Sequence, residues 1–417
     1  MEPLLYLVHR LPYPPNKGDK LRSFHLLRFL AARYDVHLGT FIDDAADRPH
    51  VEAVEQLCAS VHVASIKPAT ARLRSLAGLL TGEALTLRYY ADQTLRDWVD
   101  RTVRDHGIRR AVVFSGAMAQ YAMAANLRVV VDFVDVDSAK WRQYAQMRTW
   151  PVSSLYRREA GRLLAFERAI ARKAAASVFV TQAEADLFRA LAPECAARVH
   201  HACNGVDTAY FDPTVALQNP YGPDEEAIAF SGAMDYWPNA DAACWFAREA
   251  LPAIAAARPR ARFYVVGMNP TAAVTALAAD PRVTVTGRVP DVRPYLLHAR
   301  AVVAPLRVAR GIQNKVLEAM AMARPVVVSQ AIAASLSGSA QTHYLVADSG
   351  EAFARTTVEA MHDADIGPAA RAHVLAEHDW ERNLQPFEDL LREPSVVAAP
   401  THQRPFARTV ARTAHPS

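Results

Sequence analysis

The sequence predicts an α/β protein made of two doubly wound, Rossmann-like domains that face each other across a cleft. Short apolar runs alternate with longer helical patterns along the whole chain, which is typical of βαβ units and a parallel sheet. The 417 residues are enough for two domains of similar size, each with its own core. Because such sheets bind ligands at the carboxyl ends of their strands, we expect the functional site in the cleft.

Each half of the chain contains six candidate strands, and the second half repeats the scheme of the first. In the first half the expected strands are Leu4–Val8, Val36–Phe41, Val61–Ala64, Ala111–Phe114, Val129–Val134 and Ser177–Val180. In the second half they are Ala227–Phe230, Arg262–Val266, Val283–Thr286, Ala301–Ala304, Val326–Val328 and His343–Val346.

Turn-forming residue pairs mark the boundary between the halves. Asn-Gly, Asp-Pro, Asn-Pro and Gly-Pro follow one another between Asn204 and Asp224. The expected division is an amino-terminal domain over 1–204, a linker over 205–224, a carboxyl-terminal domain over 225–380, and a helix over 381–393 that packs back toward the amino-terminal domain. The tail 394–417 lacks apolar periodicity and is expected to be disordered.

Composition argues against several functional classes. The formal net charge is +4, but a tail without acidic residues carries three of the arginines (Arg404, Arg408 and Arg412), so the folded part is close to neutral and does not resemble a nucleic-acid binder. The four cysteines form no Cys-x-x-Cys pair, which indicates a reducing compartment and no structural zinc. Neither a signal peptide nor a membrane-spanning run is evident, so we expect a cytoplasmic protein.

The segment from Pro305 to Val327 carries the main functional signal. A strand ends in a basic loop with one glycine, a helix follows, and Pro325 precedes the next strand. The unpaired N–H groups of a helix N-terminus can hold a phosphate, and Gly311 lets the backbone approach it. Arg307 and Lys315 could neutralise a diphosphate, and Glu318, on the same side of the helix as Lys315, could accept hydrogen bonds from ribose hydroxyls. The alternative is an ordinary amphipathic helix.

This segment resembles the donor-binding signature of the family-four retaining glycosyltransferases, which have the two-domain GT-B fold. Three further stretches resemble the family in the same order, namely Asn204–Asp207 with Phe211–Pro213, Phe230–Met234, and Val285–Val289. The resemblance implies a donor site formed by Gly232, Asn239, Gly287, Val289, Gly311, Ile312, Gln313, Asn314 and Glu318, with Arg307 and Lys315 stabilising the leaving diphosphate.

Within the family, three phrases resemble a subgroup associated with exosortase (PEP-CTERM) exopolysaccharide loci: Tyr13–Lys20, Gly232–Asn239 and Gly311–Lys315. The resemblance implies a hexosyltransferase that uses a UDP- or GDP-linked sugar, needs no metal or other cofactor, and extends a glycan or polyprenyl-linked acceptor. Family members often place a first Glu eight residues before the one matched by Glu318. This chain has Arg310 there, so the sugar contacts cannot be assigned by analogy.

The acceptor side is expected in two places of the first half. The turn-rich loop after the first strand would face the cleft, with Gly18 allowing close approach and Lys20 or Arg22 meeting a phosphate, unless it is simply a solvated loop. His9 is interpreted as structural rather than catalytic. Asp135 and Asp137 follow a strand and are candidates for orienting the acceptor hydroxyl or supporting positive charge, or else for capping the next helix. A metal site at this Asp-x-Asp is rejected, because the fold that uses one has a single sheet.

A basic helix suggests where the protein could meet a membrane. Residues 157–173 contain six basic residues against Glu159 and Glu167. This face could rest on the anionic inner leaflet or form an ordinary solvated face.

Three other activities fit the sequence less well. A nucleotide-sugar epimerase would need catalytic acids and a histidine in the cleft, and none can be placed there. A degenerate partner subunit would not explain why Lys315 and Glu318 are present. A nicotinamide dehydrogenase would need a Gly-x-Gly-x-x-Gly motif after the first strand of one half, and neither half has one.

Overall fold

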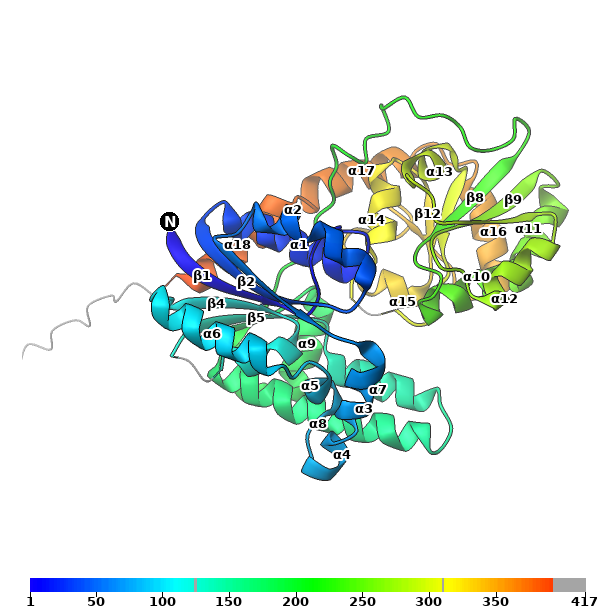
Figure 1. Ribbon diagram of the computed structural model, residues 1–417. Helices are drawn as coiled ribbons and strands as arrows, with labels where there is room; N and C mark the ends of the chain where they lie inside the picture. Colours follow the sequence, from blue (N-terminus) through cyan, green and yellow to red (C-terminus); the bar gives the residue numbers. More distant parts are fainter. Residues whose placement is uncertain (124–125, 310, 393–417) are drawn as a thin grey trace, which may run out of the picture.

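The computed structural model describes residues 1–123, 126–309 and 311–392, and it contains two parallel sheets (Figure 1). The amino-terminal sheet has the strand order β3-β2-β1-β4-β5-β6-β7, and the carboxyl-terminal sheet has the order β10-β9-β8-β11-β12-β13. In both sheets the chain winds outward in one direction and then crosses back, which is the doubly wound arrangement. The predicted fold class is therefore confirmed.

The strands of the amino-terminal domain follow the apolar runs of the sequence. They are β1 (Glu2–Val8), β2 (Tyr34–Ile42), β3 (Ser60–Ser65), β4 (Arg110–Phe114), β5 (Arg128–Val134), β6 (Ala176–Phe179) and β7 (Val199–His201). The residues of β1 from Leu4 to Val8 are completely buried, and alternate side chains join the cores on opposite faces of the sheet. A strand covered on both faces needs a continuous apolar run, which is why the sequence signal was strong here. The short strand β7 was not anticipated.

The strands of the carboxyl-terminal domain are β8 (Glu226–Ser231), β9 (Ala261–Val266), β10 (Val283–Gly287), β11 (Ala301–Ala304), β12 (Val326–Val328) and β13 (Leu345–Val346). Its helices are α10 (Trp237–Glu249), α11 (Leu251–Ala257), α12 (Ala272–Thr275), α13 (Arg293–His298), α14 (Asn314–Ala321), α15 (Gln330–Ala333), α16 (Gly350–Ala360) and α17 (Ile366–Glu377), with a 3-10 turn η4 (Ala276–Ala279).

The helices of the amino-terminal domain cover both faces of its sheet. They are α1 (Gly18–Ala31), α2 (Val51–Glu55), α3 (Pro68–Ser75), α4 (Gly78–Thr81), α5 (Leu85–Tyr89), α6 (Gln93–Asp105), α7 (Asp137–Gln146), α8 (Val152–Lys173) and α9 (Gln182–Leu191). Three 3-10 turns complete it, η1 (Ala45–His50), η2 (Gly116–Tyr121) and η3 (Pro193–Arg198). Within the described part of the chain, no helix combines the length and the apolar character that crossing a membrane requires.

The last helix, α18 (Trp380–Leu391), returns to the amino-terminal domain and packs against α1 and β5 (Figure 1). Its buried side chains recur at helical spacing and join one of the amino-terminal cores: Trp380, Leu384, Phe387 and Leu391. Arg110 Nε donates to the carbonyl of Leu391 and Arg128 Nε to that of Leu390, each at 3.0 Å. The last carbonyl groups of a helix have no partner within the helix, and these two arginines supply the missing hydrogen-bond donors at the end of α18. The predicted disordered tail lies outside the described residues.

The chain crosses between the domains at two neighbouring places. Val206 N donates to the carbonyl of His378 at 2.8 Å, and His378 Nδ1 lies 2.9 Å from the carbonyl of Asn204. A Cβ added to Gly205 would lie 2.5 Å from the backbone nitrogen of Trp380, so the two crossings are in direct contact. Apart from these contacts the segment between β7 and β8 contains no regular element.

The guanidinium of Arg22 is buried beside these crossings, in the amino-terminal domain. Its Nε donates to Asp132 Oδ2 at 2.8 Å, and its second terminal nitrogen donates to Asp132 Oδ1 at 3.2 Å. The first terminal nitrogen donates to the carbonyl of Ala202 at 2.8 Å and to Asn204 Oδ1 at 2.9 Å. Arg22 and Asp132 are 1% and 0% exposed. Because a buried charge is tolerated only when it is paired and hydrogen-bonded, this network depends on every one of its members.

We predict that Arg22→Met destabilises the protein strongly, because it leaves the carboxylate of Asp132 buried without a partner. Breaking a buried ion pair from one side costs about 3–5 kcal/mol. Urea denaturation followed by circular dichroism measures this loss. Arg28→Met, an exposed position on the same helix, is the matched control and should change the free energy of unfolding by less than about 0.5 kcal/mol. Equal effects of the two substitutions would contradict the role given to Arg22.

Candidate functional site

The carboxyl-terminal sheet reverses its winding between β8 and β11. These two strands are neighbours in the sheet although β9 and β10 lie between them in the chain, so the loops at their carboxyl ends diverge and leave a crevice. Gly232 directly follows β8, and the loop from Pro305 to Gln313 follows β11 and leads into α14. The structure thus brings the predicted glycine, basic loop and helix N-terminus to the part of the sheet where ligands of such folds bind.

Lys315 lies against the loop that follows β8. Its Nζ donates to Asn239 Oδ1 at 2.5 Å and lies 4.7 Å from the ring centre of Phe230. Asn239 Nδ2 in turn donates to the carbonyl of Ala233 at 2.9 Å, which fixes the amide. A Cβ added to Gly232, whose φ is +152°, would lie 2.9 Å from Lys315 Nζ. Gly232 is therefore the residue type that lets the ammonium reach the mouth of the crevice.

Burial shifts the pKa values of the charged pair on α14. It lowers the pKa of the Lys315 ammonium to about 7, although the carboxylate of Glu318 opposes the shift. It raises the pKa of Glu318, and Lys315 opposes that shift. Each group is thus more costly to charge here than in water, and a bound anion near Lys315 would make its protonated form more favourable.

Arg307 lies at the outer edge of the crevice. Its guanidinium forms a two-pronged ion pair with Asp241 of α10, with nitrogen–oxygen distances of 2.6 and 3.0 Å. The side chain is 56% exposed. Arg307 would have to exchange Asp241 for a phosphate in order to play its predicted role, and no local pattern indicates this competing carboxylate, which lies 66 residues away in the chain.

The residues that the sequence assigned to the remaining donor contacts lie at the end of β10 and in the loop before α14. Gly287 ends β10 with φ +67°, and nothing lies within 4 Å of the position where its Cβ would stand. Val289 packs against the core of the domain, as does Ile312 in the loop before α14. Gln313 occupies the N-cap position of α14 without capping it through its side chain.

Two contacts join this crevice to the amino-terminal domain. A Cβ added to Gly311, whose φ is +61°, would lie 2.3 Å from Asp135 Oδ1, so the carboxylate of Asp135 lies directly against the glycine. Asn204 Nδ2 donates to Asn314 Oδ1 at 2.8 Å, which anchors the first residue of α14 to the domain junction. Gly18 also faces this helix end, because its Cβ would lie 3.6 Å from Asn314 Nδ2.

Beside Gly311 the two domains line a shallow, open pocket of about 170 Å³. The amino-terminal domain contributes Gln143, Thr181, Ala183 and Glu184, and the carboxyl-terminal domain contributes Ala309, Gly311, Ala331, Ala334 and Ser335. Asp135, Gly18 and the amino end of α14 therefore meet at the cleft, as the sequence predicts for both sides of the site.

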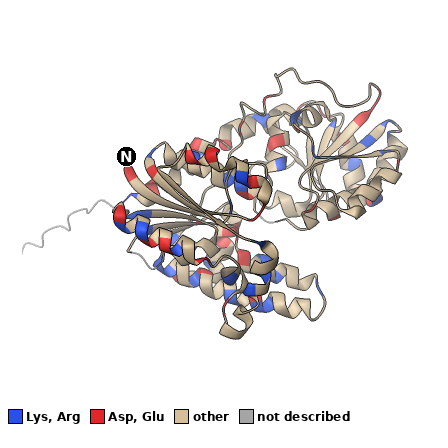
Figure 2. Cartoon of the chain, in the orientation of Figure 1, with Lys and Arg blue, Asp and Glu red and all other residues tan. Residues whose placement is uncertain are grey.

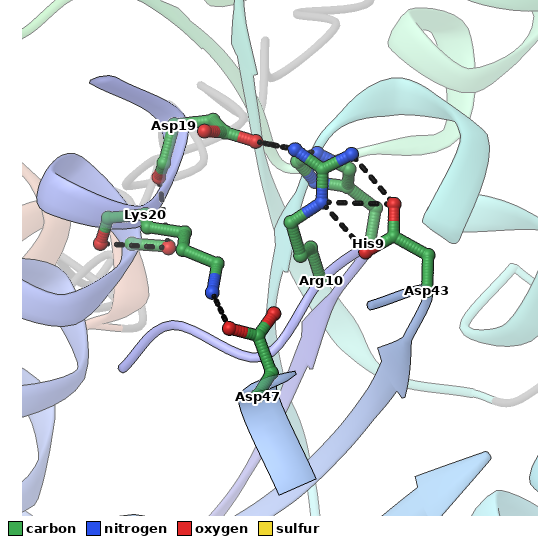
Figure 3. A network of polar contacts seen from close by, with 7 residues as sticks. His9, Arg10, Asp19, Lys20, Asp43 and Asp47 are labelled. Atoms are coloured by element: carbon green, nitrogen blue, oxygen red, sulfur yellow. Dashed lines mark hydrogen bonds and ion pairs between the residues drawn. The ribbon is translucent and has the colours of Figure 1, made fainter. Parts of the chain in front are cut away.

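Lys20 and Arg22 do not face the cleft, which corrects their predicted contact with an acceptor phosphate. Lys20 is 2% exposed, and its Nζ donates to Asp47 Oδ1 at 2.6 Å (Figure 3). Arg22 is buried on Asp132, as described above. Arg22 lies four residues before Leu26 on the face of α1 that packs on the sheet, whereas Lys20 lies on another side of the helix and is covered by Asp47 of η1.

The loop after β1 is held by a separate charged network. Arg10 lies between two carboxylates and donates to Asp19 at 2.8 Å and to Asp43 at 2.7 Å (Figure 3). His9 Nε2 lies 3.4 Å from Asp19 Oδ2, and the His9 ring stacks on Phe114. Burial would raise the pKa of Asp19, but the hydrogen bond with His9 and the charges of His9 and Arg10 hold it well below its usual range.

The amino end of α7 is capped by carboxylates from other helices. Glu167 of α8 accepts hydrogen bonds from Ser138 N at 3.0 Å and Ser138 Oγ at 2.5 Å, and Glu184 of α9 accepts from Val136 N at 2.8 Å. The N-cap residue of α7 is Val136, and no side chain caps the helix from that position. The alternative that Asp135 or Asp137 caps this helix is therefore not needed to explain how it begins.

Lys140 connects the two acids with the opposite domain. Burial would lower its pKa, but the carboxylates of Asp137 and Asp135 raise it on balance, and Tyr236 of the carboxyl-terminal domain contributes. Across the same gap, the Tyr144 ring lies edge-on to Trp237 with ring centres 5.8 Å apart. Sequence reasoning missed Lys140 and this aromatic contact because neither belongs to a motif.

Within residues 1–123, 126–309 and 311–392, no three His, Cys, Asp or Glu side chains gather in a way that could hold a metal ion. Arg310, which takes the place of the family's first Glu, lies outside the described residues.

Comparisons with known proteins agree with this geometry. Residues 225–363 match the family model described as glycosyl transferases group 1. No curated protein is similar enough in sequence to count as a match.

Solved structures of low sequence identity share the fold over nearly the whole chain. HepE from Anabaena, solved with UDP and glucose, is 17% identical with a TM-score of 0.66, and the match covers 93% of this chain and 98% of HepE. A sucrose-phosphate synthase from Thermosynechococcus elongatus is 18% identical with a TM-score of 0.69, covering 94% and 98%. WaaG, a glycosyltransferase of lipopolysaccharide biosynthesis, is 17% identical with a TM-score of 0.62, covering 93% and 99%.

Lys315, Glu318 and Gly232 all lie within the matched residues, at the crevice that the topology creates. Residues 225–363 of the carboxyl-terminal half therefore match the glycosyl transferases group 1, and the chain as a whole has the two-domain GT-B fold of these solved structures.

Proposed function

We propose that the protein transfers a sugar from a UDP- or GDP-linked donor to a glycan or polyprenyl-linked acceptor during the assembly of a bacterial exopolysaccharide, with retention of the anomeric configuration. The observation that carries the proposal is the position of Lys315, whose ammonium faces Gly232 at the crevice one residue into α14. HepE was solved with UDP and with UDP-glucose, which supports a uridine donor. The lipopolysaccharide role of WaaG and the subgroup resemblance support a polysaccharide product.

In the proposed reaction the bond between the anomeric carbon and the β-phosphate oxygen breaks. The acceptor oxygen forms its bond to the same carbon from the same face, and its proton passes to the departing phosphate. No protein nucleophile and no metal are then needed. The chain supplies the positive charge that stabilises the leaving diphosphate, through Lys315, Arg307 and the N–H groups of α14. Asp135 and Asp137 lie on the other side of the cleft and would orient the acceptor.

The proposed location is the cytoplasm, at the inner face of the membrane, because nucleotide sugars are the donors and a polyprenyl-linked acceptor is anchored in lipid. The retained Lys315 and Glu318 support an enzyme rather than a degenerate partner subunit.

Thermal-shift measurements with UDP, GDP, ADP and dTDP test the donor site. We expect one diphosphate to stabilise the protein, by about 2.7 kcal/mol at a concentration one hundred times its Kd. EDTA should leave this stabilisation unchanged. Glu318→Ala should remove most of it, because the ribose hydroxyls lose their acceptor. No stabilisation by any of the four nucleotides, or a stabilisation that EDTA abolishes, would contradict the proposal.

Substitutions of Lys315 test the leaving-group role. Lys315→Ala should lower the rate of nucleotide diphosphate release in the presence of acceptor by about a hundredfold or more, the size of effect seen when a preorganised donor is removed from a transition state. Lys315→Arg, which keeps the charge, should retain more activity. Thermal unfolding of both variants should stay close to that of the wild type. An Ala variant with full activity would refute the assignment.

The lowered pKa of Lys315 predicts a pH dependence of nucleotide binding. Only the protonated ammonium attracts a diphosphate, so the affinity should fall as the pH rises from 7 to 9, by up to about tenfold per unit. Isothermal titration at fixed ionic strength measures it. In Lys315→Arg the decline should vanish, because a guanidinium stays charged throughout this range. Parallel declines in the two proteins would assign the titration to another group.

A further inference from the structure

The exposed apolar side chains of the protein are concentrated on one part of the amino-terminal domain. The described part of the chain has thirteen large apolar side chains that are exposed, and seven of them belong to two short segments. These seven, here called the apolar tip, are Leu73, Leu76, Leu79, Leu80, Met147, Trp150 and Val152. Leu80 is 93% exposed and Trp150 is 79% exposed, which is unusual for residues of this size in a water-soluble surface.

The first segment of the tip is the pair of helices α3 and α4. Leu73, Leu76 and Leu80 recur at helical spacing, so they share one face of this segment. The second segment is the turn between α7 and α8, which carries Trp150 at its end. In Figure 1, α3 and α4 lie at the bottom of the amino-terminal domain, and the turn between α7 and α8 projects at its lower right.

The first segment is fastened to α8, which begins just after Trp150. Arg158 donates to the carbonyl of Gly78 at 2.6 Å and to that of Glu83 at 3.2 Å. Glu159 accepts hydrogen bonds from Leu85 N at 2.7 Å and Thr86 N at 2.9 Å. Because these bonds hold the turn after α4 on the first turns of α8, the first segment is fastened to the helix that directly follows the second.

Positive charge surrounds the tip. Residues 67–88 contain four basic residues and one acidic residue, Glu83, which is paired with Arg88. Residues 142–162 contain five basic residues and one acidic residue, Glu159, which is 1% exposed and already bonded. In Figure 2 several Lys and Arg positions are visible on the lower part of the amino-terminal domain. The tip therefore presents exposed apolar side chains surrounded by positive charge. Such a surface is complementary to a bilayer, which has anionic headgroups over an apolar interior.

The basic face expected over residues 157–173 is accordingly narrower than the sequence indicated. At its far end Arg168 and Arg172 both pair with Glu194, so their charge is largely balanced. The unbalanced charge lies on the first turns of α8 and on α3, beside the apolar tip.

We propose that the apolar tip and its basic surround form the docking surface for an anionic lipid bilayer, with Leu80 and Trp150 inserted below the headgroups. The proposal rests on the proposed function, because it explains how a lipid-anchored acceptor reaches the site. Helix α7 runs from Asp137 at the cleft toward the tip, and its ten residues span about 15 Å. If the tip lies in the headgroup region, a sugar attached to a membrane-anchored diphosphate would lie at the same distance from the bilayer as the cleft.

Vesicle flotation of the full chain, without nucleotide, tests the proposal. The wild type should float with vesicles that contain phosphatidylglycerol, and binding to pure phosphatidylcholine should be weaker. Adding salt should weaken the binding to the anionic vesicles. The double variant Leu80→Glu/Trp150→Glu should lower the partition coefficient by about tenfold or more, since two apolar side chains no longer leave water. Arg72→Gln/Arg148→Gln should weaken binding to anionic vesicles only.

Leu375→Glu is the matched control, because Leu375 is 50% exposed on α17 of the other domain. It should bind vesicles like the wild type, and all variants should keep the wild-type circular dichroism and the wild-type stabilisation by nucleotide. Failure of the wild type to float, or equal flotation of the double variant, would overturn the proposal. So would dimerisation without lipid that the double variant abolishes, since a second copy would then cover the tip. Vesicle binding by a protein that binds no nucleotide would refute the proposed function alone.

Discussion

The buried guanidinium of Arg22 holds together the parts of the molecule that the site depends on. It lies between Asp132 of β5 and Asn204 at the domain junction, and Asn204 in turn holds Asn314, the first residue of α14. A polar chain therefore runs from the core of the amino-terminal domain to the helix end that would bind a diphosphate. Because an unpaired charge in this position would cost several kcal/mol, roughly 3–5 by analogy with other buried pairs, the chain has little freedom to rearrange.

This arrangement also explains how two separate sheets make one site. The crevice between β8 and β11 exists in the carboxyl-terminal domain alone, but its open side is formed by Asp135 and Gly18 of the other domain. Gly311 and Asp135 are in direct contact, so a change in the angle between the domains would change the shape of the pocket beside them. Both crossings of the chain lie next to Arg22.

Electrostatics give the crevice its preference for an anion. Lys315 is half-buried, and among the described residues the amide oxygen of Asn239, the ring of Phe230 and the charge of Glu318 compensate its charge. The ammonium of Lys315 is therefore incompletely solvated when it is protonated. A bound diphosphate would supply the negative charge and the hydrogen-bond acceptors that water supplies in solution. Arg307 differs, because Asp241 already balances it at the exposed edge.

The sequence predicted the parts of the structure that depend on local pattern. Buried strands such as β1 have a continuous apolar run, and the loop before α14 combines a glycine, basic residues and a helix start within a few positions. The charge of Arg22 suggests an exposed side chain, so charge alone does not predict its burial. The helical spacing of Arg22 from Leu26 and Leu30 does place it on the buried face of α1. The carboxylates of Glu167, Asp241 and Asp132 meet their partners across 29, 66 and 110 residues, so no local spacing reveals them.

The most direct measurement is a crystal structure of the protein with the nucleoside diphosphate that stabilises it best. The account predicts that the β-phosphate lies within hydrogen-bonding distance of Lys315 Nζ and of the first N–H groups of α14. It also predicts that the ribose hydroxyls contact the carboxylate of Glu318, while the base rests on the loop from Gly287 to Val289. A nucleotide bound elsewhere, or bound in the crevice with its phosphates turned away from Lys315, would contradict the account.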